Sequence, residues 1–225
     1  MATPIPINVS DSGPETAYLA RGVLDAGTLD TIRQTNAAFL AMVARRLARS
    51  PAGSPVLGLE PALAVRLVAL EPAGREAITR CPYTLFNLRF EDAAFWRGVV
   101  LDASRPTPGV ADDESTFART AVFLAWHLAQ TGDFTAALVL GMASEVQEAW
   151  RGLPLSGLDR AAMAALPHLQ ARWGGNARFW PDLLAAAEKP GAGQAERVRL
   201  LGLQLLAADG YRTERARRER RHSQP

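Results

Sequence analysis

The stretch that decides the fold is NAAFLAMVARRLARS, residues 36–50, in which apolar residues return every three or four positions. That spacing places them on one face of an α-helix, and Ser50-Pro51 ends the run. Helical spacing recurs along the rest of the chain, between breaks rich in glycine and proline. No alternating pattern long enough to predict a β-strand is present. The sequence therefore predicts an all-α fold.

A second stretch repeats the first at a nearly constant distance. Phe39-Leu40-Ala41 recurs as Phe123-Leu124-Ala125, and four further matches follow in the same order at an offset of 83 or 84 residues. These matches are Leu57-Gly58 with Leu140-Gly141, Leu70 and Gly74 with Leu153 and Gly157, Arg89-Phe90 with Arg172-Trp173, and Phe95-Trp96 with Phe179-Trp180. Because a solenoid needs three or more repeats, two units favour a pseudo-symmetric pair, the covalent equivalent of a C2 dimer.

The breaks in helical spacing divide the chain into six segments. The clearest break is SRPTPGVADD, residues 104–113, which contains prolines, a glycine and acidic residues. We expect a flexible N-terminal segment at 1–27, helical unit 1 at 28–103, a linker at 104–114, helical unit 2 at 115–190, a C-terminal helix at 194–211 and a basic tail at 212–225.

Charge is distributed unevenly along the 225 residues. The net charge is +2, but RTERARRERR at 212–221 carries +4 by itself, so the rest of the chain carries about −2. A near-neutral body with a basic tail is unlike a basic DNA-binding domain. The tail arginines could contact phosphates without reading bases, or could form the solvated end of a helix with i,i+4 ion pairs. They are Arg212, Arg215, Arg217, Arg218, Arg220 and Arg221.

The sequence offers little material for catalysis or metal binding. Cys81 is the only cysteine, so no internal disulfide can form, and the three histidines are scattered. We interpret His127 as a core or interface residue and His168 as a structural or surface residue. The serines and glycines form no G-x-S-x-G, P-loop or G-x-G-x-x-G motif. We therefore expect no enzyme activity, no cofactor, no bound metal and no small-molecule substrate.

The N-terminal stretch and the lengths of the apolar runs predict the cellular location of the protein. The start, MATPIPINVSDSGPE, has neither the basic start nor the apolar core of a secretory signal. The apolar runs are far shorter than the about 20 residues that a membrane helix needs. The sequence predicts a cytoplasmic protein without membrane association.

The tryptophans divide into two kinds. Trp96 and Trp180 lie on apolar helix faces at corresponding places of the repeat, which predicts that both are buried in the core. Trp150 and Trp173 have fewer apolar neighbours in the sequence. We take these two as candidate contacts with a partner protein.

The segment 36–90 resembles the flagellar transcriptional activator family FlhD. The resemblance rests on three stretches in order, NAAFLAMVARRLARS, VLGLEPALAVRLVAL and EPAGREAITRCPYTLFNLRF. The second half follows the same order in FLAWHLAQTGDFTAALVLGMASEVQEAWRGL and later in ALPHLQARW. The similarity covers about 55 residues in each half.

This resemblance implies an all-α, dimerising regulatory protein that acts by protein contact, at promoter DNA, together with a zinc-containing FlhC-like partner. FlhD proteins are single-unit homodimers, whereas this chain would carry the pair in one polypeptide. Cys81 lies near the family's cysteine but out of register, since Phe86 falls nearer that position, so no intersubunit disulfide is carried over. The alternative is an all-α adaptor or accessory protein of a secretion or flagellar system without a DNA role. An enzyme with an unfamiliar helical site is a third possibility, disfavoured by the scarcity of His, Cys and Lys.

Overall fold

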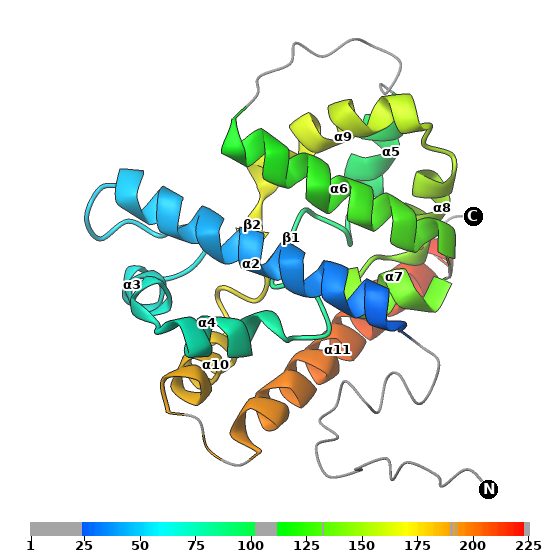
Figure 1. Ribbon diagram of the computed structural model, residues 1–225. Helices are drawn as coiled ribbons and strands as arrows, with labels where there is room; N and C mark the ends of the chain where they lie inside the picture. The colour runs from blue at the N-terminus through cyan, green and yellow to red at the C-terminus, as the bar shows by residue number, and fades with distance from the viewer. Residues whose placement is uncertain (1–23, 102–111, 132, 190, 192, 223–225) are drawn as a thin grey trace, which may run out of the picture.

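A computed structural model describes residues 24–101, 112–131, 133–189, 191 and 193–222. The expected N-terminal segment up to residue 23 and the expected linker from 104 to 111 lie outside these ranges. The described residues are all-α apart from one pair of two-residue strands. The elements follow in the order α2 (Ala26–Arg49), α3 (Pro61–Ala69), α4 (Pro72–Thr79), β1 (Phe86–Asn87), α5 (Ala93–Leu101), α6 (Asp113–Thr131), α7 (Asp133–Leu140), α8 (Ser144–Arg151), η1 (Leu155–Gly157), α9 (Leu158–Ala165), η2 (Leu166–His168), β2 (Gln170–Ala171), α10 (Phe179–Glu188) and α11 (Gln194–His222), shown in Figure 1.

The long helix α2 begins two residues before the sequence pattern predicted, because Asp25 caps it. The Asp25 carboxylate accepts a hydrogen bond from the backbone N–H of Thr28 at 2.8 Å. The helix ends at Arg49 with Ser50 as its C-cap, just before Pro51, as expected. Helix α6 likewise begins early, at Asp113, because the Asp112 carboxylate accepts from the Ser115 N–H at 2.7 Å. Unit 2 was expected to start at 115, so that boundary is wrong by two residues.

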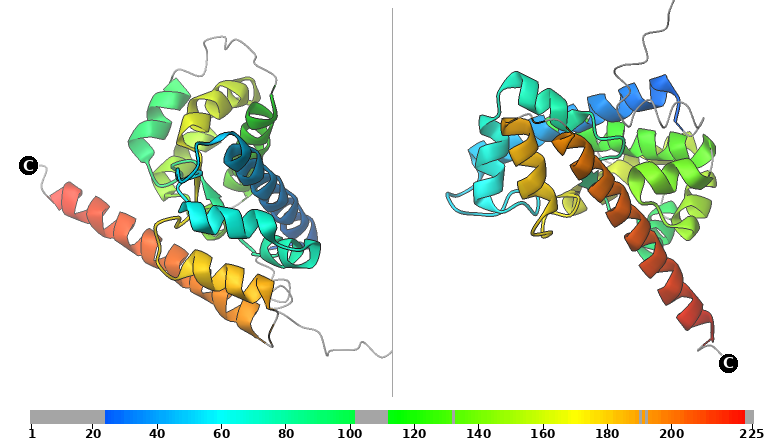
Figure 2. Two further views of the ribbon diagram at one scale, coloured as in Figure 1. Left: turned by 90° about the vertical axis from the view of Figure 1, so that its left-hand side faces the viewer. Right: turned by 90° about the horizontal axis from the view of Figure 1, so that it is seen from below.

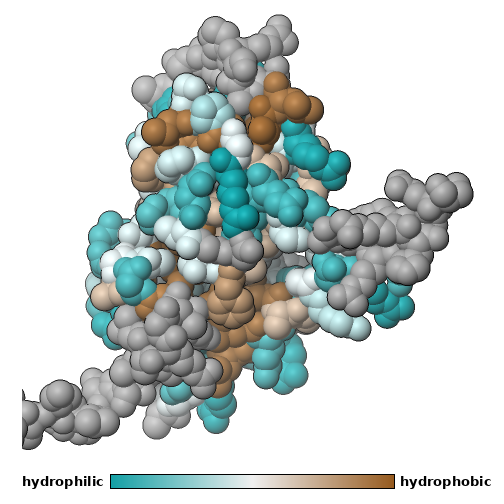
Figure 3. Space-filling view, turned by 90° about the vertical axis from the view of Figure 1, so that its right-hand side faces the viewer, coloured by the Kyte–Doolittle hydropathy of each residue, from teal (hydrophilic) through white to brown (hydrophobic). Residues whose placement is uncertain are grey.

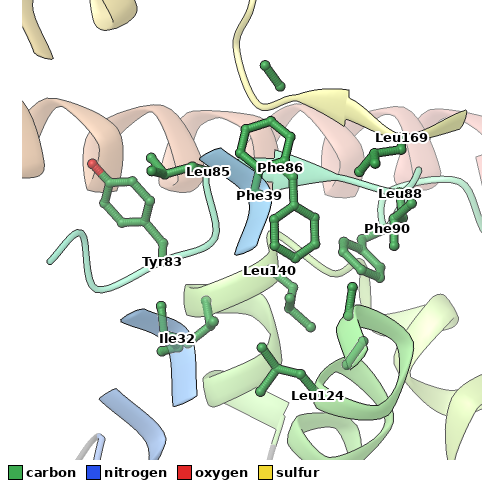
Figure 4. Close-up of a cluster of buried hydrophobic side chains, with 14 of the residues drawn as sticks. Ile32, Phe39, Tyr83, Leu85, Phe86, Leu88, Phe90, Leu124, Leu140 and Leu169 are labelled. Carbon is green, nitrogen blue, oxygen red and sulfur yellow. The ribbon is translucent and has the colours of Figure 1, made fainter. Parts of the chain in front are cut away.

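The buried face of α2 packs against the segment that links α4 to α5. Phe39 is fully buried, and its ring centroid lies 5.7 Å from that of Phe86 and 6.2 Å from that of Phe117 on α6. The cluster around these rings joins side chains from both halves of the chain (Figure 4). One continuous core therefore serves the two predicted units.

A buried asparagine fixes the path of this linking segment. Asn36 on α2 is fully buried, and its amide nitrogen donates to the backbone carbonyls of Thr79, Cys81 and Tyr83 at 3.4, 3.4 and 3.0 Å. Its carbonyl oxygen accepts from the Leu85 N–H at 2.9 Å. These bonds satisfy backbone groups that have no helix to satisfy them.

The last helix of each half packs on the other half. Helix α5 lies against α8 and α9, whereas α10 lies against α3 and α4, and α2 crosses α6 (Figure 1). Glycine allows the closest of these approaches, because a Cβ on Gly74 of α4 would lie 2.8 Å from the Ala187 carbonyl oxygen of α10. The two halves are therefore interlocked and not simply side by side.

The two short strands also join the halves. Strands β1 and β2 pair antiparallel, with Phe86 opposite Ala171 and Asn87 opposite Gln170. Each strand has two residues, too few to produce a visible alternation of apolar and polar residues. The all-α prediction is confirmed for the described residues, and this small ladder is the element it omitted.

The turn that follows each strand has the same hydrogen bonds in both halves. A residue in the left-handed region, with φ of 60° in the first half and 53° in the second, accepts the N–H three residues on, at 2.9 and 2.8 Å. The side chain of that third residue then caps the next helix, at 2.9 Å in both cases. The residues are Arg89, Asp92 and Phe95 in the first turn and Trp173, Asn176 and Phe179 in the second.

The C-terminal helix α11 runs from Gln194 to His222, so the expected boundary at 211 is wrong. The basic tail consists largely of good helix formers, and the Arg215 Nε–H donates to Glu219 Oε1 at 2.9 Å in an i,i+4 pair. Its first half lies against α7 and α10, and its C-terminal part projects from the body (Figure 2). None of the described helices is both long and apolar enough to span a membrane.

Candidate partner-binding surfaces

The first candidate contact, Trp150, does not lie on the surface. It is fully buried on α8, with its ring centroid 4.5 Å from that of Trp96 and 6.1 Å from that of Phe90. Helix α5, from the other half of the chain, covers Trp150, so this candidate contact is not accessible to a partner in the folded chain. Trp96 and Trp180 are fully buried, as predicted.

The second candidate, Trp173, is half-buried. Its indole N–H donates to Asp209 Oδ2 on α11 at 2.9 Å, and its ring packs edge-on against Tyr83 and Phe179, with centroids 5.6 and 4.7 Å apart. Trp173 therefore anchors α11, and its role as a partner contact stays a prediction.

A different aromatic residue, Phe123, is accessible to a partner protein. Phe123 on α6 is 55% exposed and lines an apolar groove of about 720 Å³ between α2, α6 and the η1–α9 turn. Leu155, at the opposite wall, is 61% exposed. The groove is lined by Thr31, Arg119, Thr120, Phe123, Leu124, His127, Leu155, Leu158 and Asp159, and we call it the Phe123 groove.

Charged and polar groups edge the apolar floor of the Phe123 groove. The Arg119 guanidinium donates to the Asp159 carboxylate, which joins α6 to α9. His127 is exposed on the same face of α6, so its interpretation as a core residue is wrong, and its interpretation as an interface residue stays a prediction. An apolar centre with a polar rim is the arrangement found at protein–protein interfaces.

The sequence contained a signal for this groove. Thr116, Arg119, Thr120, His127 and Gln130 follow helical spacing and form the polar face of α6. Phe123 is the apolar residue within that face. A large apolar residue on a solvent-facing helix stripe is a mark of an interaction site.

Phe39 and Phe123 match in the sequence repeat, but they differ in burial. Phe39 is fully buried and Phe123 is more than half exposed. In α6 the ring that packs against Phe39 belongs instead to Phe117, which is 3% exposed. The two long helices therefore present different faces to the core.

Two smaller apolar grooves lie elsewhere. One, of about 580 Å³, lies between α2, α3 and α4 and is floored by Leu40 and Leu67. The other, of about 330 Å³, lies between α7 and α11, where Phe134 is 65% exposed. In Figure 3 apolar side chains, coloured brown, lie near the upper edge of the face drawn and again below its centre.

The predicted phosphate-contacting residues fall on the projecting part of α11. Arg212 and Arg215 are exposed, and each is paired with an acidic neighbour, Asp209 and Glu219 respectively. Arg217, Arg218, Arg220 and Arg221 follow on the same helix, and their side chains lie outside the described part of the structure. Part of the tail charge is thus neutralised locally, and a basic helix end also suits the negative pole of the helix dipole.

The remaining reactive side chains lie in the interior or apart from one another. Cys81 is 1% exposed, and burial raises the pKa of its thiol to about 11. Burial also raises the pKa of Tyr83. His168 packs its ring against Phe95 at 5.0 Å. Within the described ranges no three His, Cys, Asp or Glu side chains lie together in a way that could hold a metal ion.

Comparison with known proteins gave no match: no protein-family model, curated protein or solved structure resembles this chain closely enough to be assigned.

Proposed function

We propose that this chain is a non-enzymatic, FlhD-like regulatory protein that acts by binding another protein. It works at promoters through a DNA-binding partner of the FlhC type. The single observation that carries the proposal is the Phe123 groove, in which a large aromatic ring is exposed on an otherwise polar helix face. Aromatic residues at the centre of a water-excluded patch contribute most of the binding energy in many interfaces.

The pairing of the two strands supports the FlhD-like part of this proposal. At an offset of 84 residues Phe86 corresponds to Gln170 and Asn87 to Ala171. Phe86 pairs with Ala171, and Asn87 pairs with Gln170. Each residue thus lies opposite the counterpart of its neighbour, which is the register that a twofold axis between the strands produces.

The matching turns after β1 and β2 support the same internal twofold axis. The left-handed residues Arg89 and Trp173 are also 84 residues apart. In this alignment of the repeat Arg89 corresponds to Trp173 and not to Arg172. The alignment is one residue away from the match made on sequence alone. An internal duplication, folded as a pseudo-symmetric pair, accounts for the register, the turns and the crossed packing of α5 and α10 together.

The basic end of α11 has a secondary part in this proposal. With +4 on 212–221 and about −2 on the rest, the body repels a phosphate backbone while the helix end attracts it. The charged stretch 212–221 contains no aromatic or amide side chain to read bases. DNA binding by this chain alone is therefore weak, falls steeply with salt and has little sequence preference.

The test co-expresses the full chain with the FlhC-like protein of the same genome and measures complex formation by size-exclusion chromatography with light scattering. Anisotropy then measures binding of the complex to a labelled promoter duplex. Phe123→Glu should abolish the complex, because it places a charge in the apolar groove. Val65→Glu is the matched control, since Val65 is 54% exposed and lines none of the grooves described above.

The anisotropy measurement on promoter DNA distinguishes the proposed promoter function from the adaptor alternative. A complex that forms through Phe123 but gives no sequence-specific binding to promoter DNA favours an adaptor of a secretion or flagellar system. Equal loss of the complex in both variants, or in neither, removes the Phe123 groove from the proposal. Sequence-specific DNA binding by the chain alone after deletion of 212–225 would contradict the proposal that the partner, and not this chain, recognises promoter DNA.

A further inference from the structure

A small polar pocket lies away from the Phe123 groove, where four parts of the chain meet. It has a volume of about 260 Å³ and lies between β1, the end of α7, the residues after β2 and α11. This is just below the range typical of sites for drug-sized ligands, about 300–1,000 Å³, so a smaller molecule is the appropriate occupant. Its walls are Asn87, Glu91, Leu140, Gly141, Arg172, Trp173, Leu206, Asp209, Arg212 and Thr213.

The base of the pocket is a buried guanidinium with one open nitrogen. Arg172 is 5% exposed, and its Nε and Nη2 donate to the Phe86 carbonyl, the Thr84 hydroxyl and the Leu140 carbonyl. Its Nη1 has no hydrogen-bond partner among the described residues. The same nitrogen lies 3.1 Å from the position that a Cβ on Gly141 would take, so this glycine leaves it uncovered.

The charge of Arg172 is not balanced by direct contact. No carboxylate of the described residues lies within ion-pair distance of its guanidinium. Burial lowers the pKa of Arg172 to about 10, which still leaves it charged at neutral pH. Its hydrogen-bond partners are all neutral oxygens, and its guanidinium carbon also lies 5.6 Å from the centroid of the Trp173 ring. A buried cation without a direct carboxylate partner retains attraction for an anionic group.

Two carboxylates stand farther out in the same pocket. Glu91 accepts a hydrogen bond from the Asn87 amide at 2.9 Å. Asp209 accepts from the Trp173 indole at 2.9 Å and also from the Arg212 guanidinium. Both act electrostatically on Arg172 without touching it. The pocket is thus positive at its buried end, and its outer side carries the negative Glu91 together with the Asp209–Arg212 ion pair of α11.

We propose that this pocket binds a small zwitterionic α-amino acid, with its carboxylate on the open N–H of Arg172 and its ammonium group toward Glu91 and Asp209. Leu140 and Leu206, both nearly fully buried, provide apolar wall for a short side chain. The two carboxylates disfavour phosphate or a simple anion, and the guanidinium disfavours a simple amine. This inference does not depend on the proposed partner.

A second polar pocket nearby lacks the buried arginine that the Arg172 pocket contains. It is lined by Asn87, Arg89, Glu91, His168 and Gln170. Its arginine, Arg89, has a side chain that is 41% exposed and is already paired with Asp92. It therefore offers no buried charge without a carboxylate partner, and we assign no ligand to it.

The test is isothermal titration calorimetry of the full chain with each of the standard L-amino acids at millimolar concentration. Acetate, methylamine and inorganic phosphate serve as probes of each charge alone. We expect saturable binding of at least one small amino acid and no saturable binding of the three probes. No saturable binding by any amino acid, or phosphate binding at equal affinity, overturns the proposal.

Variants locate the site. Glu91→Gln and Asp209→Asn keep an acceptor oxygen but remove a charge, and each should weaken binding by roughly tenfold or more. Asp182→Asn, on an exposed turn of α10 outside this pocket, is the matched control and should leave binding unchanged. Arg172→Lys should abolish binding, and if it does not fold, the two rim variants still decide. Unchanged affinity in both rim variants excludes this pocket.

Discussion

Two buried tryptophans have the same burial but different hydrogen bonding. The Trp180 indole N–H donates to the Arg172 carbonyl at 2.8 Å. The indole N–H of Trp150 is buried and has no partner among the described residues. Burial area alone therefore does not rank the two positions.

We predict that Trp180→Phe destabilises the protein more than Trp150→Phe, by about 1–3 kcal/mol in the free energy of unfolding. Both changes shrink a buried ring, but Trp180→Phe also leaves the Arg172 carbonyl without that donor. Urea unfolding of the two variants and of the parent chain measures the difference. An equal loss in both would mean that the hydrogen bond contributes nothing.

Cys81 predicts a dependence of stability on alkaline pH. Burial raises the pKa of its thiol from the ordinary 9.0 to about 11. Between these values the unfolded chain loses the proton before the folded chain does, so the stability that this group provides falls as pH rises. We expect the stability advantage of the parent chain over Cys81→Ala, measured by urea unfolding, to shrink across this window. A constant difference would contradict the buried, protonated thiol.

At the scale of elements, a glycine sets how α11 meets the core. A Cβ on Gly202 would overlap the Tyr83 ring, whose hydroxyl donates to the Arg199 carbonyl at 3.3 Å. The ring is buried and cannot rotate away as a flexible chain would. Gly210, two turns on, has open space around it.

We predict opposite effects for the same substitution at these two positions. Gly202→Ala should destabilise by about 1–3 kcal/mol, because the added methyl overpacks the α11 contact. Gly210→Ala should be neutral or stabilise by up to about 1 kcal/mol, because alanine favours helix and meets no atom. Thermal unfolding followed by circular dichroism measures both. Neutral or stabilising effects of equal size at both positions would show that helix propensity, and not the Tyr83 contact, governs the site.

Local signals predicted the elements better than they predicted the surfaces. The break at Ser50-Pro51 gave the end of α2 to within a residue, because capping and chain breaking act locally. The burial of Trp150 was missed, because the helix that covers it lies some 50 residues away in the sequence. The open N–H of Arg172 could not be predicted either, since its side-chain partners lie on two segments far from it in the sequence, residues 84–86 and Leu140.

At the scale of the whole molecule, the crossed packing of α5 and α10 makes each half incomplete. Trp96 on α5 is buried by contacts that include Trp150 on α8, and α10 closes the surface of α3 and α4. Neither half contains all the residues that cover its own apolar faces.

We therefore predict that fragments 1–103 and 104–225 do not unfold cooperatively as separate monomers. Mixed together, they should recover the helical signal and the unfolding transition of the intact chain. Circular dichroism with size-exclusion chromatography measures both properties. A monomeric fragment 1–103 with a cooperative transition of its own would contradict the interlocked arrangement.

Synthesis on the ribosome proceeds from the N-terminus. Helix α5 is therefore made before the helices of the other half that it packs against, whereas α10 is made after the helices of the other half that it packs against. Helix α5 is made before α8 and α9, and at about 5–20 residues per second the chain needs roughly 3–13 s to reach the end of α9. Until then the apolar face around Trp96 has no cover and is open to chaperones. Helix α10 is made after α3 and α4, so the residues of these helices that it packs against are already present when it leaves the ribosome. The nascent chain is therefore most vulnerable to aggregation while the second half is still being translated.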